Sequence, residues 1–169
     1  GSDTLFFDYT VAVGDASADL NYAATSSLVL NGAAVQDLAG NDLNLTLPNP
    51  ADGTAENLAK NSAIVIDGIA PTVSIVTANR AADSHWRTDS LLTVYVDFSE
   101  NIAVTGTPQL TLKTKTDGST TILTFAQIVG NDSLSFVYTV AAGDGVSFLD
   151  YAATNSLALN GGTIRDAAG

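Results

Sequence analysis

The acidic side chains are the residues of this sequence best suited to chemistry, and nearly all of them are aspartate. The 169 residues include 18 acidic and six basic side chains, for a net charge of −12, and only Glu56 and Glu100 are glutamate. Aspartate favours turns because its short side chain bonds nearby backbone groups, and its hard oxygens are suitable ligands for Ca²⁺. The charge argues against nucleic acids and anionic membranes as partners. The pattern predicts a protein made soluble for a salty exterior, or one in which cations neutralise part of the charge.

Two turn regions carry aspartates at spacings that a hard cation could use. The stretches "VGDASADLN" and "QDLAGND" supply one set, and a second set lies near the end of the chain. Calcium takes several oxygens and mixes carboxylates with backbone carbonyls, which such turns offer. No twelve-residue EF-hand loop is present, and Asx turns that cap their own backbone account for the same residues equally well. The candidate ligands in these turns are Asp15, Asp19, Asp37, Asp42, Asp144, Asp150 and Asp166.

A second candidate calcium site involves the residues on either side of a short link. Asp67 ends the apolar stretch "SAIVIDG", and Glu100 follows "VDFS" in the next part of the chain. We expect Asp89 to lie in a loop that reaches the same pole. These carboxylates would repel one another across a short joint unless a cation lay between them. The sequence therefore predicts Ca²⁺ at this joint.

Enzyme chemistry has little support in the sequence. The single histidine, His85, lies in the loop "RAADSHWRTDS" (80–90) with Trp86 and Arg87, and the chain has no cysteine. The members of a catalytic triad converge from separate elements, and no serine elbow is present. We expect no enzyme. This loop has two interpretations: Trp86 covers one end of the fold between solvated neighbours, or the three residues bind a ligand such as a sugar.

The first forty residues come back at the end of the chain. Residues 1–40 align without a gap on residues 130–169, and 23 of the 40 positions are identical. A period of about 129 residues is that of a domain rather than a solenoid unit. We therefore expect matched positions to share strand environments in the two copies, pairing Phe7, Tyr9, Leu20, Tyr22, Leu28 and Leu30 with Phe136, Tyr138, Leu149, Tyr151, Leu157 and Leu159.

The repeat also predicts the domain boundary. A fresh alternating strand begins after Pro71, which interrupts strand pairing. Residues 1–70 would be the C-terminal part of one repeat, and residues 71–169 the N-terminal part of the next, without a counterpart of 41–70. The four-residue join at 68–71 reaches at most about 14 Å, which is too short for 41–70 to fold back and complete the second domain. We interpret the sequence as a segment of a longer array of tandem repeats.

The segments between the turns are typical of strands. "LLTVYVDFS" places Leu92, Val94, Val96 and Phe98 on one face and polar residues on the other. "TILTFAQIVG", "SLSFVYTVAAG" and "SAIVIDG" are similar, and "DGST" predicts a hairpin turn. The one helix candidate, 51–61, could equally be a loop. The pattern predicts an all-β fold of immunoglobulin-like antiparallel β-sandwich domains in tandem.

The motifs "VDFSENIAVTGTPQLTL", "FVYTVAAGD", "DYAATNSLALNGGTIRDAAG" and "VIDGIAPTV" resemble the bacterial immunoglobulin-like tandem repeats of large secreted surface proteins and adhesins. The resemblance covers essentially the whole chain. It implies a β-sandwich, an extracellular or cell-surface location, neighbouring repeats as partners, and calcium near domain junctions. The expected function is a structural spacer or stalk that holds distal domains which contact a host surface or glycan. Alternatives are a carbohydrate- or protein-binding module and a subunit of an extracellular filament.

Two further features bear on location. No stretch approaches the roughly 20 apolar residues of a membrane span, so we expect none. The first ten residues lack a basic region followed by an apolar one, so an export signal would have to lie outside this sequence. The absence of cysteine excludes disulfides and thiolate metal sites.

Overall fold

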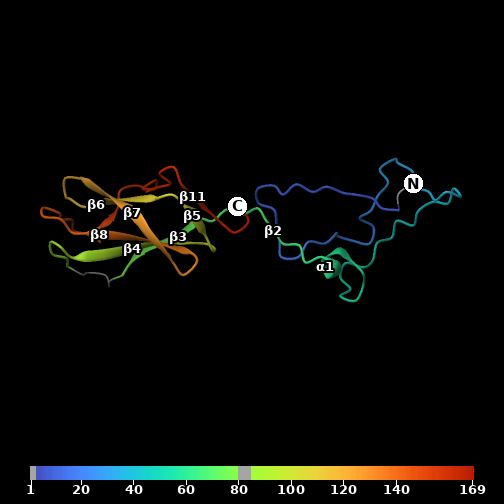
Figure 1. The fold of residues 1–169 in the computed structure, drawn as a ribbon, viewed down its shortest axis with the longest axis horizontal. Helices are drawn as coiled ribbons and strands as arrows, with labels where there is room; N and C mark the ends of the chain where they lie inside the picture. Colours follow the sequence, from blue (N-terminus) through green and yellow to red (C-terminus); the bar gives the residue numbers. More distant parts are fainter. Residues whose placement is uncertain (1–2, 80–84) are drawn as a thin grey trace. The chain divides into compact units, whose positions relative to one another are not determined.

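The computed structural model describes residues 3–79 and 85–169, which form two compact units, Gly1–Ile69 and Ala70–Gly169 (Figure 1). The fold is mostly β-strand with almost no helix, and its sheets are antiparallel and curled. No helix among the described residues is both long and apolar enough to span a membrane. Each unit is described by itself.

The second unit contains most of the regular structure. Its strands are β3 (Val73–Ala78), β4 (Leu91–Phe98), β5 (Ala103–Thr105), β6 (Gln109–Lys113), β7 (Thr120–Val129), β8 (Ser133–Thr139), β9 (Asp150–Tyr151), β10 (Leu157–Ala158) and β11 (Thr163–Arg165). Seven of them form one sheet in the order β10-β6-β7-β8-β4-β3, with β9 also paired to β6. β11 pairs with β5 in a separate two-stranded sheet.

β4 confirms the alternation that the sequence predicts. Leu92, Val94, Val96 and Phe98 are buried, while the residues between them are only partly covered. A strand buries one face when its side chains alternate at period two, which is the pattern of this segment. β8 lies beside β4, with Phe136 opposite Val94, and β7 lies on the other side of β8.

The core of the second unit joins strands that are far apart in the sheet order. Leu110 and Leu112 of β6 pack in one apolar cluster with Val96 of β4 and Phe136 of β8. The sheet must therefore curl so that its ends face a common interior. The predicted hairpin is confirmed between β6 and β7, where Gly118 takes a φ of 88° that favours glycine.

The first unit has little regular structure. β1 (Ala16–Ser17) pairs antiparallel with β2 (Ile66–Asp67), and α1 (Leu58–Asn61) is a single helical turn. The helix candidate 51–61 is thus correct only for residues 58–61. The turn begins there because the side chain of Asn57 caps it by accepting the N–H of Lys60. "SAIVIDG" forms a ladder over two residues, extended by the bond from the Leu20 N–H to the Ile64 carbonyl at 2.8 Å.

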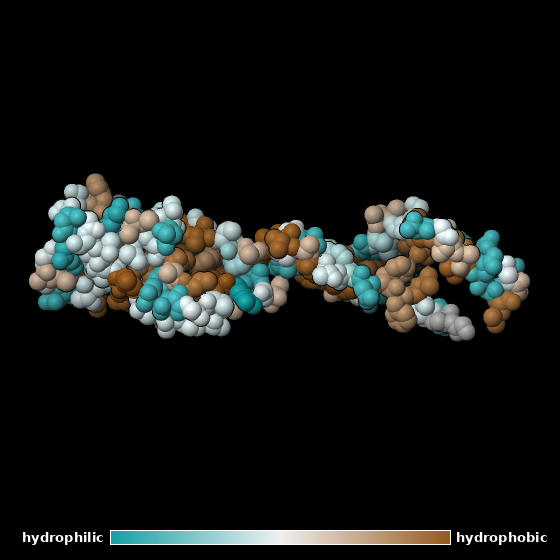
Figure 2. Space-filling model, turned by 90° about the horizontal axis from the view of Figure 1, so that it is seen from above, coloured by the Kyte–Doolittle hydropathy of each residue, from teal (hydrophilic) through white to brown (hydrophobic). Residues whose placement is uncertain are grey.

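The expectation that the two copies share strand environments is wrong for the leading strand. Phe136 is 0% exposed within β8, whereas its counterpart Phe7 is 77% exposed and lies outside any strand. β8 is buried because β4 and β7 flank it. These two flanking strands come from residues 91–129. That stretch occurs once in the sequence, and it pairs with the second copy. Figure 2 shows hydrophobic residues, in brown, at the surface of the molecule.

Candidate functional site

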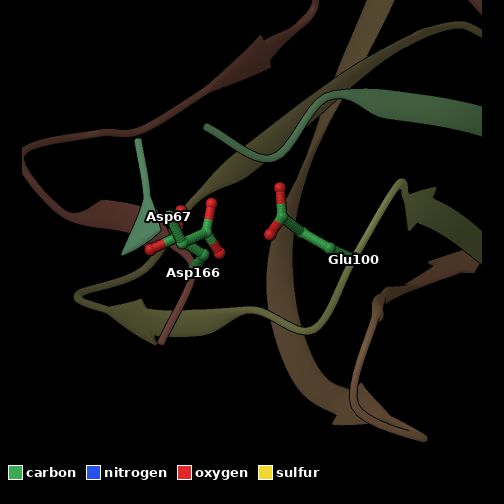
Figure 3. A group of neighbouring side chains, drawn as sticks. All are labelled: Asp67, Glu100 and Asp166. Carbon is green, nitrogen blue, oxygen red and sulfur yellow. The ribbon is translucent and has the colours of Figure 1, made fainter. Parts of the chain in front are cut away.

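Two acidic side chains of the second unit lie at one end of the β5–β11 pair. Glu100 precedes β5 and Asp166 follows β11, and the antiparallel register places Arg165 opposite Ala103. Both carboxylates are half-buried and offer oxygens within 4.8 Å of each other (Figure 3). Two like charges at that distance repel by about 1 kcal/mol in water and by more where solvent is partly excluded. This pair can therefore hold a cation.

The local bonding of Asp166 leaves part of its carboxylate for a ligand. Its Oδ1 accepts the N–H groups of Ala168 and Gly169, both at 2.8 Å. These bonds fix the carboxylate as an Asx turn and leave Oδ2 without a hydrogen bond from the turn. A carboxylate held this way is pre-oriented, which lowers the entropy cost of binding an ion.

Asp67 is the third carboxylate drawn in Figure 3, and it belongs to the first unit. It ends β2, and its Oδ1 accepts the N–H of Ile69 at 3.2 Å. Its predicted role as a calcium ligand together with Glu100 stays a prediction.

Asp89 does not share a pole with Glu100, which corrects the expectation from the sequence. Asp89 comes two residues before β4, and Glu100 two residues after it. An eight-residue strand spans roughly 26 Å at about 3.3 Å per residue, so the two carboxylates lie at opposite ends of β4. Asp89 has a φ of 66° and donates its N–H to the Val140 carbonyl, which makes it a turn residue.

Asp15 and Asp144 hold matched turns rather than a shared cluster of acids. Asp144 accepts the Tyr138 hydroxyl at 2.6 Å and the Ala141 N–H at 2.8 Å. The hydrogen bond from Tyr138 is the largest cause that lowers the pKa of Asp144 below its usual range. The pKa of Tyr138 is raised, chiefly because its side chain is buried. In the first copy, Asp15 is bonded to Tyr9 and Ala12, with its pKa lowered in the same way.

Three of the remaining candidate ligands, Asp37, Asp42 and Asp150, accept hydrogen bonds from residues near them in the sequence. Asp37 accepts the N–H groups of Ala39 and Asn41, and the Asn41 side chain and backbone lower its pKa. Asp42 accepts the Gln36 side chain, and Asp150 accepts the Tyr151 N–H. Among the described residues, neither these acids nor Asp19 form a group of three within an ion's reach. The calcium role of these residues stays a prediction, while an Asx turn is visible for Asp37, whose side chain accepts the N–H of Ala39 two residues further on.

The loop around the single histidine has an asymmetric burial. His85 and Arg87 are exposed, whereas Trp86 is half-buried against the core of the second unit. Residues 80–84 of this loop, including Asp83, lie outside the described residues. His85 and Trp86 also line a groove of about 770 Å³ in the second unit. No local pattern in the sequence indicates this groove, because its walls come from segments that lie far apart in the chain.

Comparison with known proteins adds no relative: no family model, curated protein or solved structure matches this chain.

Proposed function

We propose that this chain is a structural spacer from a large bacterial surface protein, built from immunoglobulin-like β-sandwich domains in tandem and stiffened by calcium. The internal repeat carries the proposal, since 23 of 40 positions recur between 1–40 and 130–169. Repetition at domain length extends a molecule without needing a separate active site in each copy. The charge of −12 fits a chain exposed to cations outside the cell. No catalysis is part of this proposal.

The calcium part of the proposal rests on the acidic pair of the second unit. Glu100 and Asp166 bring two like charges close together at half-buried positions. A divalent cation would remove their repulsion and add the attraction of both carboxylates. Binding to the folded form at 100 times the dissociation constant would add about 2.7 kcal/mol to stability.

Calorimetric titration of the full chain with Ca²⁺ after EDTA treatment tests this site. We expect binding that the double variant Glu100→Gln/Asp166→Asn loses. The matched control is Asp97→Asn/Asp132→Asn, which removes the same charge elsewhere in the second unit. If no Ca²⁺ binds at millimolar concentration, or if the double variant binds as the parent does, the proposed site is wrong. Asp67→Asn tests in the same titration whether Asp67 takes part.

The spacer role is tested by the stiffness of the chain. The sequence has no cysteine, so Ser26→Cys and Thr116→Cys place one spin label in each unit at exposed positions. We expect Ca²⁺ to narrow the distribution of label-to-label distances measured by pulsed electron resonance, and EDTA to broaden it. A distribution that Ca²⁺ leaves unchanged contradicts a calcium-stiffened spacer, even where the ion binds.

A ligand-binding role for His85, Trp86 and Arg87 is the second candidate, favoured by the groove that the first two line. Part of the Trp86 ring surface is already used against the core, which limits its area for stacking on a sugar. A glycan-array screen of the full chain tests this role, with Trp86→Ala as the variant that should abolish any signal.

A further inference from the structure

A second hollow of the second unit lies on the sheet face that points away from the core. β4 alternates along its length, so Val94 and Val96 enter the core while Tyr95 and Asp97 lie on the opposite face. The hollow measures about 590 Å³ and lies between β3, β4 and the turn that joins β7 to β8. We call it the acidic hollow, and it is lined among others by Ile75, Tyr95, Asp97, Val129, Asp132 and Ser133.

The two carboxylates of the acidic hollow lack partners in the part of the chain that the structure describes. Asp97 is half-buried in β4, and the strand register places it opposite Ser133, the residue after Asp132. Among the described residues, neither carboxylate has a hydrogen bond or an ion pair. No group of three acids that could hold a metal ion includes either of them there. The acidic hollow therefore carries two uncompensated negative charges without the ligand set of a metal site.

Ser133 places a buried hydroxyl at the bottom of the acidic hollow. It is 7% exposed, and its Oγ has no hydrogen-bond partner in the described structure. On the same face, the buried Ser135 donates its hydroxyl to the Gln127 carbonyl at 3.0 Å. A buried polar atom without a partner destabilises a fold, so it calls for a group that supplies the missing bond. This observation points to a ligand independently of the charge of the two acids.

The acidic hollow lies away from the surface that segment 41–68 covers in the repeat. In the first copy this segment bonds to residues between 14 and 37. The counterparts of those residues lie between 143 and 166, and no residue in that range lines the acidic hollow. A copy of segment 41–68 that bonds in the same way to 143–166 would leave the hollow open.

We propose that the acidic hollow binds the side-chain ammonium of a lysine from a basic segment of a partner protein. An ammonium has three N–H donors and no acceptor, which matches the acceptors on Asp97, Asp132 and Ser133. Ile75 and Val129 are partly exposed and also line the hollow, so they can cover the apolar stem of the lysine. The net charge of −12 attracts a basic segment to the chain.

The arrangement favours lysine over other ligands. An arginine fork fits one carboxylate with two bonds, whereas the acceptors here come from three residues and suit a compact ammonium. Calcium needs more oxygen ligands than two acids supply. A sugar would leave the charges of both acids unbalanced. This inference goes beyond the spacer role, and it does not depend on calcium.

Amide chemical shifts of the ¹⁵N-labelled full chain test this site with a defined probe. The probe is the capped peptide acetyl-Gly-Gly-Lys-Gly-Gly-amide, titrated at constant ionic strength after metal ions are removed. We expect saturable shifts confined to the amides of residues 95–98 and 130–135. The same peptide with Nε-acetyllysine keeps the stem but loses the charge, so it should bind about tenfold more weakly or less. The arginine version should also bind more weakly than the lysine peptide.

Three variants separate binding from folding. Asp97→Asn/Asp132→Asn should lose the saturable shifts. Glu100→Gln/Asp166→Asn removes the same charge elsewhere in the second unit and should bind the peptide as the parent does. Ser133→Ala deletes the unpartnered hydroxyl, so we expect it to be at least as stable as the parent in urea and to bind several-fold more weakly. A merely structural serine would change stability without changing binding.

Several results would overturn the proposal. The absence of saturable shifts, equal binding of the Nε-acetyllysine peptide, or unchanged binding by Asp97→Asn/Asp132→Asn would exclude an ammonium site. Shifts spread over the exposed acids of both units would show non-specific attraction to the net charge. Displacement of the peptide by Ca²⁺ in Glu100→Gln/Asp166→Asn would assign the hollow to the metal. Tighter binding of cadaverine than of the peptide would exclude a partner segment as the source of the ammonium.

Discussion

The two copies of the repeat agree in their turns and differ in their strands. Gly14 and Gly143 have φ values of 91° and 90°, and the aspartate after each accepts a tyrosine hydroxyl. Asn31 and Asn160 also match, at 47° and 49°. Tyr9, however, is 58% exposed, while its counterpart Tyr138 is 4% exposed. The turns form from residues close in sequence, whereas burial of the strand needs partners from elsewhere in the chain.

Each copy also has what the other lacks. The second copy has strands β4 and β7 on either side of β8, but among the described residues its segment 143–149 carries no antiparallel neighbour of the 62–68 type. The first copy has that neighbour, with β1 paired to β2, but its residues 4–11 have no flanking strands in the described structure. The comparison shows that nearly the same sequence takes the structure that its available partners allow.

The largest expected contrast is between matched phenylalanines. Phe136→Ala should lower the unfolding free energy of the second unit by about 3–5 kcal/mol, because it opens a cavity among fully buried neighbours. Phe7→Ala should change it by less than about 0.5 kcal/mol, because Phe7 is exposed in the other unit. Urea unfolding followed by Trp86 fluorescence measures both. Equal effects would contradict the difference between the copies.

Removing the matched hydroxyls should give a smaller contrast. Tyr138→Phe deletes the bond to Asp144 from a buried ring and should cost about 1 kcal/mol in the same unfolding assay. Tyr9→Phe should leave the Trp86 transition in place, since Tyr9 lies in the first unit. A Tyr138→Phe variant as stable as the parent would show that the bond contributes nothing.

The same bond predicts how the second unit responds to acid. The pKa of Asp144 is lowered in the folded state, chiefly by the Tyr138 hydroxyl. A lowered pKa stabilises the fold above the unfolded value of about 3.9, and that contribution is lost as pH falls through the folded value. The urea concentration at the midpoint of unfolding, followed by Trp86 fluorescence, should therefore fall as the pH is lowered below about 4. It should fall less steeply in Tyr138→Phe. Identical slopes in parent and variant would exclude Asp144 as a source of the acid response.

Turn substitutions should give the smallest contrast between copies, because the turns are alike. Gly143→Ala places a Cβ at a φ of 90° and should cost about 1 kcal/mol through local strain. Gly14→Ala has the same strain at 91°, which amide chemical shifts of residues 12–16 would register as a local change. If only one of the two alanines disturbs its turn, the local structures are not equivalent.

The turns and the strands of the second unit are predictable from the sequence, and the reason is physical. Period-two alternation specifies β4, and glycine and aspartate specify the bends, through interactions within a few residues. The exposed position of Phe7 could not be predicted from its own segment, because Phe136 occupies a similar local sequence and is buried. Long-range pairing decides between these two outcomes.

The candidate site also has features that the local sequence predicts and features that depend on long-range pairing. Glu100 and Asp166 are each recognisable as possible ligands, but the sequence assigns them to different sites, since the pairing of β5 with β11 joins segments far apart in the chain. The expectation that Asp89 lies at the same end of β4 as Glu100 is wrong, because the charge of a loop residue does not specify at which end of a strand the loop lies. The groove beside Trp86 has no local signal at all, since β3 and 145–151 form it only in the folded unit.

Hydrogen exchange of the unmodified chain, read by mass spectrometry, tests most directly that partners decide the structure of the repeat. One experiment compares residues 133–139 with residues 4–10 in the same molecules, and buried ladder amides exchange far more slowly than open ones. We predict strong protection of 133–139, where β8 lies between β4 and β7, and exchange close to the unprotected rate for 4–10. Comparable protection of both segments would contradict the account.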